Sequence, residues 1–334
     1  MSPRHRADEA DRPGPLERML DPDRLRRLTA TLSPARVARR HGFPWTAAPT
    51  PVGVEPPEEP DELGDRYDTD WARRPLARAT RRALMETVGR AGTRALARPT
   101  VRNLDRLEDL GTNAIFVANH HSHLDTPLLL TRLPQPWRGE MVVAAAADHF
   151  FDTRPKAALM AWAYGAIPME RKRVSRRSAD SSARLVDDGW SLLIFPEGGR
   201  SPDGWGQTHK GGAAYLAVRC GVPVVPIHID GTGRILPKGD NVPTPGSIEV
   251  NIGAPLRPLD GEDARRFASR LERAIAELAD ETWTDWWTAR LNAHAGDTPD
   301  MHGPPDSWIR DWRSPDRRPR VTSSDRRWSS GRRR

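Results

Sequence analysis

The chain has 334 residues, of which 37% are hydrophobic and 32 are prolines, and its formal net charge is +7. The single cysteine, Cys220, excludes an internal disulfide and lies in the apolar run AAYLAVRC, which favours a buried, inert thiol over a nucleophile. No apolar run approaches the roughly 20 residues that a membrane-spanning helix needs, and the first residues, MSPRHRADEADRPG, lack the apolar stretch of a signal peptide. We therefore expect a cytoplasmic protein whose basic surface could meet nucleic acid, anionic lipid, coenzyme A or an acidic carrier protein.

Residues 1–65 are rich in Pro, Arg, Asp and Glu, and this composition predicts a low-complexity, disordered N-terminal region. Residues 66–98 are predicted to form a basic amphipathic helix, because positions 71–98 hold eight Arg against one Glu. An apolar stripe at helical spacing runs along this helix, formed by Leu76, Thr80, Leu84, Val88 and Ala91. Two interpretations remain open: a helix packed on the domain with an Arg-rich outer face, or an interfacial helix that docks on anionic lipid.

Short apolar runs alternate with helix-like segments between residues 99 and 292. Strands are expected at 114–118, 141–147, 165–169, 191–195, 222–229 and 247–253. Helices are expected at 126–133, 155–164, 176–188, 211–220 and 263–279, and the stretch TWTDWWTARL is expected to finish the last of them. This alternation predicts an α/β domain with a mixed, mostly parallel sheet covered by helices. Residues 293–334 are rich in Arg and are predicted to be a disordered tail.

The stretch VANHHSHLDTPLLL, residues 117–130, carries the strongest chemical signal of the chain. A buried strand, AIFVA, stops at Asn119, and a helix pattern opens near Asp125. His120 and Asp125 are five positions apart, so a regular helix would turn them about 140° away from each other, and a strand would place them on opposite faces. They can meet only across a strand-to-helix turn. A His held by a carboxylate beside a bound hydroxyl is a general base.

Simpler interpretations of the same residues remain open. Asp125 could be a helix N-cap, or it could form a Ser-x-x-Asp capping box with Ser122. With His121 and His123, the turn could also supply zinc-type ligands, but we expect these two histidines to be exposed turn residues and predict no metal site. The sequence contains no Gly-x-Ser-x-Gly elbow, which argues against a serine hydrolase.

The block NHHSHLD resembles the Asn-His-x-Ser-x-x-Asp block of the glycerol-phosphate acyltransferase family. Three further blocks follow in the family's order, namely GAIPMER (165–171), FPEGGRS (195–201) and VPVVPI (222–227). They are similar to the family's Gly-x-Ile-x-x-x-Arg, Phe-Pro-Glu-Gly-Thr-Arg-Ser and Val-Pro-x-x-Pro blocks. Each block alone is a weak signal, whereas four in order are a strong one. The resemblance covers roughly residues 101–256 and implies an α/β fold of the class predicted above.

The resemblance also implies roles for individual residues. His120 would take a proton from the acceptor hydroxyl and Asp125 would orient His120, without an acyl-enzyme. The implied substrate-binding residues are Arg171, Glu197, Gly198 and Arg200, with Lys210 as a further phosphate candidate and Pro226 on the acyl-chain side. This chain has Gly199 where the family usually has Thr, so a hydroxyl contact from that position is lost.

The implied reaction transfers an acyl group from acyl-CoA or acyl-carrier protein to 1-acylglycerol 3-phosphate, giving phosphatidic acid in phospholipid biosynthesis. An alternative keeps the chemistry and changes the acceptor to glycerol 3-phosphate or another lysolipid. A different class, a non-enzymatic basic protein that binds membrane or nucleic acid, fits the composition but leaves the four blocks unexplained. We expect no cofactor besides the thioester co-substrate, no nucleic-acid partner, and a peripheral position on the inner face of the cell membrane, against its anionic surface.

Overall fold

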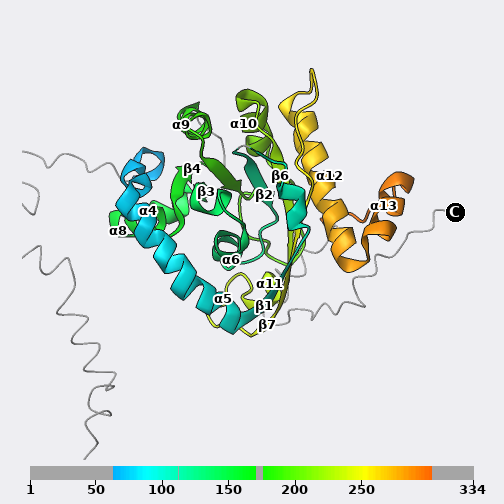
Figure 1. The fold of residues 1–334 in the computed structure, drawn as a ribbon, viewed down its shortest axis with the longest axis horizontal. Coiled ribbons are helices and arrows are strands. Elements are labelled where there is room, and N and C mark those ends of the chain that lie inside the picture. The colour runs from blue at the N-terminus through cyan, green and yellow to red at the C-terminus, as the bar shows by residue number, and fades with distance from the viewer. Residues whose placement is uncertain (1–62, 112, 171–175, 303–334) are drawn as a thin grey trace, which may run out of the picture. The chain divides into compact units, whose positions relative to one another are not determined.

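The computed structural model describes residues 63–111, 113–170 and 176–302. Within these residues the strands form one seven-stranded sheet in the order β1-β7-β6-β2-β5-β3-β4 (Figure 1). The strands are β1 (Ala97–Arg102), β2 (Ile115–Ala118), β3 (Met141–Ala146), β4 (Ala166–Met169), β5 (Ser191–Ile194), β6 (Val224–Asp230) and β7 (Gly246–Ile252). The pair β6–β7 is antiparallel and the other neighbouring pairs are parallel, so the prediction of a mixed, mostly parallel sheet is confirmed.

Helices and short turns precede, connect and follow the strands. Before β2 these are η1 (Gly64–Arg66), η2 (Asp70–Arg73), α4 (Pro75–Leu84), η3 (Met85–Gly89), α5 (Arg90–Leu96) and η4 (Leu104–Leu107). Between β2 and β5 they are α6 (Asp125–Arg132), η5 (Trp137–Gly139), α7 (Ala147–Phe150), α8 (Arg154–Tyr164) and α9 (Arg176–Asp187). After β5 they are α10 (Gly212–Cys220), α11 (Thr232–Ile235), α12 (Ala264–Trp283) and α13 (Trp286–Ala295).

The sheet separates two hydrophobic cores. Strand β2 is buried on both faces because it lies between β5 and β6, which explains its uninterrupted apolar sequence. On one face Phe116 and Ala118 pack with the leucines of α6. On the other face Ile115 and Val117 pack with side chains of α9, α10 and α12. Figure 1 shows this division, with α9, α10 and α12 on one side of the sheet and α6 with the α4–α5 helix on the other.

Strand β1 was not predicted, because the sequence ARPTVR has no apolar alternation and continues a helix-like segment. It pairs with β7 from Ala97 opposite Gly246 to Arg102 opposite Asn251. Long-range pairing at the edge of the sheet therefore ends the basic helix at Leu96, two residues before the predicted boundary.

The basic segment packs on the domain, as the first of the two interpretations of its sequence requires. Helix α4, the π-helical turn η3 and α5 follow one another and pack on the core that contains α6, with Met85 and Leu96 facing it. Arg81 also faces inward, and its Nη1 donates to the carbonyl oxygen of Ala72 at 3.1 Å. The predicted apolar stripe points the other way: Leu76 is 77% exposed and Val88 is 65% exposed.

The end of the chain differs from the prediction. Helix α12 ends at Trp283, and Asp285 caps a separate helix, α13, by accepting from the backbone N–H groups of Trp287 (2.9 Å) and Thr288 (3.0 Å). The predicted disorder from residue 293 onward is wrong for 293–302. Helix α13 continues to Ala295, and the following segment packs on the domain because Met301 contributes to the hydrophobic core around α12. The predictions for residues 1–62 and 303–334 lie outside the described residues.

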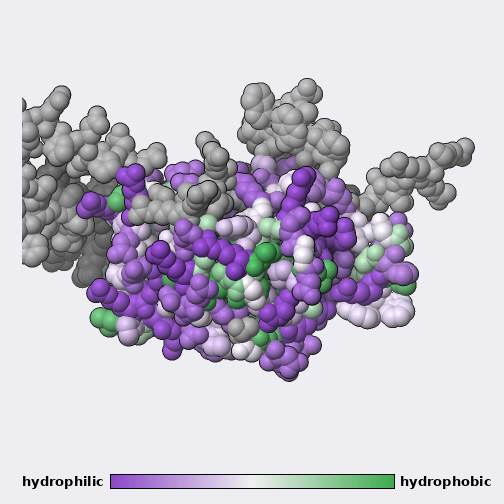
Figure 2. All heavy atoms as spheres, turned by 90° about the horizontal axis from the view of Figure 1, so that it is seen from above, coloured by the Kyte–Doolittle hydropathy of each residue, from purple (hydrophilic) through white to green (hydrophobic). Residues whose placement is uncertain are grey.

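The surface of the domain is mostly hydrophilic in the view of Figure 2, with hydrophobic side chains gathered near the centre of that face. Among the described residues, no helix combines the length and the apolar composition needed to cross a membrane.

Candidate active site

The turn that follows β2 is tied to β6 by Asn119. This buried side chain donates to the carbonyl oxygen of Ile229 at 2.8 Å and accepts from the backbone N–H of Ile229 at 2.7 Å. The amide therefore replaces the strand pairing that β2 loses when its chain turns away. The residue after it, His120, is thus held at the carboxyl end of a central strand, where the loops of several parallel strands converge.

His120 and Asp125 meet across the turn, as predicted. The Nδ1 atom of His120 lies 2.8 Å from Oδ2 of Asp125, the first residue of α6. Burial alone would raise the pKa of Asp125, but the hydrogen bond and charge of His120, the Thr232 hydroxyl and the Ser122 backbone outweigh it and lower that pKa. An ionised carboxylate only accepts, so Nδ1 carries the proton and Nε2 is the basic nitrogen.

The turn around this pair is rigid. Oδ2 of Asp125 also accepts from the backbone N–H groups of His121 (2.8 Å) and Ser122 (2.9 Å). The ring of His120 stacks on Phe195, with centroids 4.1 Å apart. These contacts fix both the backbone and the ring, which is the preorganisation that a general base needs.

The Asp125 carboxylate also makes one of the two hydrogen bonds of the predicted capping box. Asp125 accepts from the Ser122 backbone as in a capping box, whereas the Ser122 hydroxyl accepts from the backbone N–H of Leu124 (3.2 Å) and donates to Leu236 O (2.8 Å). The cap and the His–Asp pair therefore coexist. His123 is exposed as predicted, but His121 is half-buried against Gly233 of α11. Within the described ranges, no group of three or more His, Cys, Asp or Glu side chains is arranged to hold a metal ion.

Glu197, in the loop after β5, is directed at the backbone of the same turn. Its Oε1 accepts from the N–H of His120 at 2.9 Å, and its Oε2 accepts from the N–H of Gln207 at 3.2 Å. The side chain is 4% exposed. Burial, with the nearby charge of Asp125, raises the pKa of Glu197 to about 8, although the backbone hydrogen bonds act in the opposite direction. Since both oxygens bind backbone amides, Glu197 positions the turn that carries His120, and its contact with substrate stays a prediction.

The rest of the FPEGGRS block forms one wall beside His120. The N–H of Ser201 donates to His120 O at 2.8 Å, so the block holds the catalytic turn from a second point. Gly198 has a φ of +73°, and a Cβ built there would lie 2.5 Å from Nζ of Lys210, which places the Lys210 side chain across this glycine. Arg200 is half-buried, and burial lowers its pKa while the charge of Asp125 opposes the shift. Lys238, which the sequence did not single out, donates from Nζ to Arg200 O at 3.2 Å.

Pro226 does not join this group. It lies in β6 opposite Val117, and its ring packs against Gly253 and Leu278 of α12, on the face of the sheet away from α6. The structure shows a buried packing contact for Pro226, and its expected position on the acyl-chain side of the site stays a prediction. The last residue of the predicted set, Arg171, lies outside the described residues.

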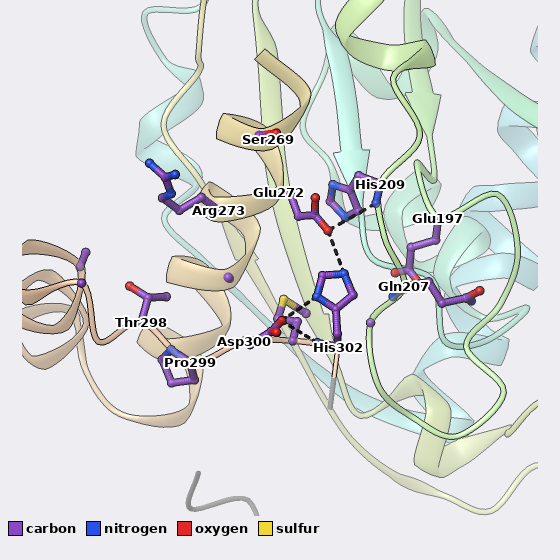
Figure 3. Close-up of a pocket in the computed structure, with 15 residues that line it drawn as sticks. Glu197, Gln207, His209, Ser269, Glu272, Arg273, Thr298, Pro299, Asp300 and His302 are labelled. Carbon is purple, nitrogen blue, oxygen red and sulfur yellow. Dashed lines mark hydrogen bonds and ion pairs between the residues drawn. The ribbon is translucent and has the colours of Figure 1, made fainter. Parts of the chain in front are cut away.

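A pocket of about 500 Å³ reaches Glu197 from the α12 side of the sheet. It lies between the loop that carries Gln207 and His209, helix α12, and the segment 296–302 (Figure 3). Figure 3 shows His302 directed at Glu272, and the structure gives 3.0 Å from Nε2 of His302 to Oε1 of Glu272. The sequence analysis missed this pocket, because its outer wall is the segment that composition assigned to a disordered tail.

Comparisons with known proteins agree with this geometry. Residues 98–230 match the family model described as Acyltransferase. The chloroplastic 1-acyl-sn-glycerol-3-phosphate acyltransferase of Brassica napus is 32% identical over 189 residues, which are 53% of this chain and 49% of the relative. The human 1-acyl-sn-glycerol-3-phosphate acyltransferase alpha is 30% identical over 178 residues, covering 51% of this chain and 60% of the relative. The chain thus spans about half the length of the first of these curated relatives.

A crystal structure, that of the 1-acyl-sn-glycerophosphate acyltransferase of Thermotoga maritima, is also similar. It is 25% identical in sequence, with a TM-score of 0.49, and the match covers 60% of this chain and 81% of that chain. The four sequence blocks, the His120–Asp125 pair and the family model point in one direction. The resemblance to the glycerol-phosphate acyltransferases is confirmed for residues 98–230, which match the acyltransferase family model and align with relatives that are named 1-acyl-sn-glycerol-3-phosphate acyltransferases.

Proposed function

We propose that this protein transfers an acyl group from an acyl thioester to 1-acylglycerol 3-phosphate, giving phosphatidic acid. The observation that carries the proposal is the hydrogen bond of 2.8 Å between His120 Nδ1 and Asp125 Oδ2, which makes Nε2 the basic nitrogen of the ring. The relatives in Brassica napus and human indicate the acceptor, since both are named 1-acyl-sn-glycerol-3-phosphate acyltransferases.

The chemistry follows from this geometry. The acceptor hydroxyl gives its proton to Nε2 of His120 as its oxygen attacks the thioester carbonyl carbon. Asp125 stabilises the imidazolium that forms, because its carboxylate is ionised and bonded to Nδ1. When the carbon–sulfur bond breaks, the proton passes from Nε2 to the departing thiolate. A base placed in this way contributes roughly 10²–10⁴ in rate. The scheme uses no covalent enzyme intermediate, no cofactor and no metal ion.

Cationic side chains near the pair suit a phosphorylated acceptor. Arg200 and Lys210 lie in the loop after β5, next to the residues that hold His120. A guanidinium can bind phosphate through two parallel N–H donors, and an ammonium adds a point charge. Arg171 completes the proposed set on the sequence block alone. The proposed donor is an acyl thioester, carried by either coenzyme A or acyl-carrier protein.

We also propose that the exposed stripe of the basic helix docks on an anionic bilayer, at the inner face of the cell membrane. Leu76 and Val88 are exposed, and so are Arg74, Arg82 and Arg94 of the same segment. An apolar stripe flanked by Arg is the pattern of an interfacial helix. Such docking would bring the active site to a lipid acceptor that resides in the bilayer.

The test is an acceptor panel with one labelled acyl thioester and purified protein, read out by lipid mass. The expected product is phosphatidic acid from 1-acylglycerol 3-phosphate. If glycerol 3-phosphate or another lysolipid is acylated and 1-acylglycerol 3-phosphate is not, the proposed mechanism stays and the acceptor changes. No acylation of any member of the panel by coenzyme A or carrier-protein thioesters would overturn the proposal.

A further inference from the structure

Gln207 joins two parts of the active-site loop that follows β5. Its side-chain Nε2 donates to the carbonyl oxygen of Gly199 at 3.2 Å, and its backbone N–H donates to Oε2 of Glu197 at 3.2 Å. Hydrogen bonds from both the backbone and the side chain of Gln207 oppose the rise in the pKa of Glu197. Figure 3 shows Gln207 next to Glu197 on the wall of the pocket. One residue therefore ties the support of His120 to the glycine pair that precedes Arg200.

The bond to Gly199 lies where the backbone has few restraints of its own. Gly198 and Gly199 carry no Cβ, and Gly198 adopts a φ of +73°. Because glycine is conformationally permissive, local sterics do not fix the direction in which the chain enters Arg200. A hydrogen bond to the Gly199 carbonyl fixes the whole peptide plane between residues 199 and 200, since that plane is rigid. The Gln207 amide thereby restrains the backbone that carries the Arg200 side chain.

The peptide on the other side of Arg200 is held as well. Lys238 donates from Nζ to Arg200 O at 3.2 Å, and the N–H of Ser201 donates to His120 O at 2.8 Å. Both of these atoms belong to the peptide that follows the Cα of Arg200, whereas Gln207 bonds the peptide that precedes it. With both flanking planes held, the Cα–Cβ direction of Arg200 is set before any ligand arrives, which is the preorganisation that a binding site needs.

The loop that carries Gln207 has anchors of its own. The N–H of Gly206 donates to Met301 O at 2.8 Å, and Met301 packs in the hydrophobic core around α12. Beyond Gln207, the N–H of His209 donates to Oε1 of Glu272 in α12 at 3.4 Å. Gln207 is therefore fixed from both sides by a part of the chain that follows the segment matched by the family model.

We infer that Gln207 is a positioning residue of the acceptor site, whose side-chain amide directs Arg200 toward the phosphate of the acceptor. This rests on the proposed function, which gives that phosphate to Arg200. Gln207 is uncharged and acts through the backbone of Gly199, so its loss should weaken acceptor binding and leave the base, His120, in place. The backbone N–H of Gln207 remains in every side-chain variant, so Glu197 keeps that bond.

The experiment measures acceptor KM, donor KM and kcat for the full chain and for Q207M, because Met has a similar length and no hydrogen-bond donor. Q207M should raise the acceptor KM roughly three- to tenfold, the range for the loss of one neutral hydrogen bond. Donor KM and kcat should stay within about twofold of the wild type. Thermal unfolding of each variant is the control for folding.

A matched control is available in Q135M. Gln135 lies in the exposed stretch before η5, and its Oε1 accepts from the N–H of Gly139 at 3.2 Å, so this variant also loses one bond between a glutamine side chain and the backbone. All three kinetic constants of Q135M should equal those of the wild type.

A double-mutant cycle tests whether Gln207 acts through Arg200. R200Q removes the guanidinium, so adding Q207M to R200Q should change the acceptor KM by less than about twofold. Independent effects would instead multiply. This coupling is a readout that a purely structural role of Gln207 would not produce.

The outcomes separate this inference from the proposed function. A wild type that acylates no phosphorylated acceptor contradicts the proposed function. A wild type that does acylate it, with an unchanged acceptor KM in Q207M and a raised one in R200Q, contradicts the positioning role alone. A parallel rise of acceptor and donor KM in Q207M, or a rise that persists in full in the R200Q background, would also overturn it, because Gln207 would then act on the loop as a whole.

Discussion

The Glu197 carboxylate accepts a hydrogen bond from the backbone N–H of His120 at 2.9 Å, while the Asp125 carboxylate bonds the ring of the same histidine at 2.8 Å. The catalytic turn is therefore held by two buried carboxylates with different properties. Interactions with the turn lower the pKa of Asp125, whereas burial raises the pKa of Glu197 to about 8. Two carboxyl groups whose environments separate their pKa values can have separate tasks, and here one stabilises charge on the ring and the other holds the backbone.

We expect H120A to lose at least roughly 100-fold in kcat, because the acceptor hydroxyl then has no positioned base. D125N should also lose most of the rate, since an amide can still accept from the backbone of the turn but cannot stabilise the imidazolium as a carboxylate does. Both are checked by steady-state kinetics, with thermal unfolding as the control for folding. Full activity of D125N would reduce Asp125 to a cap of the turn and remove its catalytic role.

Glu197 predicts a pH-dependent stability. Its pKa is raised from 4.5 to about 8, so the folded state keeps a proton that the unfolded state releases between these values. The protonated Glu197 stabilises the folded state fully below about pH 4.5, and this stabilisation is lost as the pH rises through about 8. The free energy of unfolding should fall by about 2 kcal/mol between pH 6 and 8 from this group.

The measurement is urea unfolding of wild type, E197Q and the exposed control E108Q across that pH range. E197Q should show a smaller decrease than the other two proteins. It should also be less stable at pH 6, because a Gln amide can accept from His120 N–H or from Gln207 N–H but not from both. Identical pH profiles for the three proteins would contradict the assigned ionisation of Glu197.

The exposed side of the basic helix predicts salt-sensitive binding to membranes. Replacing Arg74, Arg82 and Arg94 together with Gln should weaken co-sedimentation with anionic vesicles by on the order of 100-fold, at about 1 kcal/mol for each basic residue near the surface. Arg81 is left unchanged because it is buried and bonds to Ala72 O.

A control with the same loss of charge replaces Arg184, Arg265 and Arg273, which are exposed on α9 and α12 across the sheet from this helix. That variant should sediment like the wild type, and high salt should release both. Equal weakening by the two triple variants would mean that total charge, not the helix, governs the binding.

Gly253 lies so close to Pro226 and Leu278 that adding one methyl group there should lower the free energy of unfolding. In G253A the new Cβ would lie 2.7 Å from Cγ of Pro226 and 2.9 Å from Cδ1 of Leu278, so β6 and α12 must shift. We expect the free energy of unfolding to decrease by roughly 1–3 kcal/mol. The comparison is G92A in α5, where no atom lies within 4 Å of the added Cβ, and where Ala should stabilise the helix by about 0.5–1 kcal/mol. Urea unfolding measures both, and a tolerated G253A would mean that Pro226 has room to move.

The sequence by itself determined the elements whose signal is local. The apolar runs of β2, β3, β5 and β6 identified these strands, since strands buried on both faces are near-continuous runs of apolar residues. The spacing of His120 and Asp125 required a strand-to-helix turn, because no regular element brings positions five apart together. These inferences depend only on residues that are close together in the sequence, and the structure agrees with them.

The tertiary structure alone decided which partner each side chain meets. The structure shows that Glu197 supports the His120 backbone, 77 positions away in the chain, a contact that no local pattern indicates. Pro226 was placed under α12 because β6 presents alternate residues to opposite faces of the sheet. The sequences of strand β1 and of the packed segment that ends at residue 302 show no apolar periodicity that would predict their structure. Their order comes from backbone pairing with β7 and from burial of Met301, which are long-range contacts that composition and periodicity do not encode.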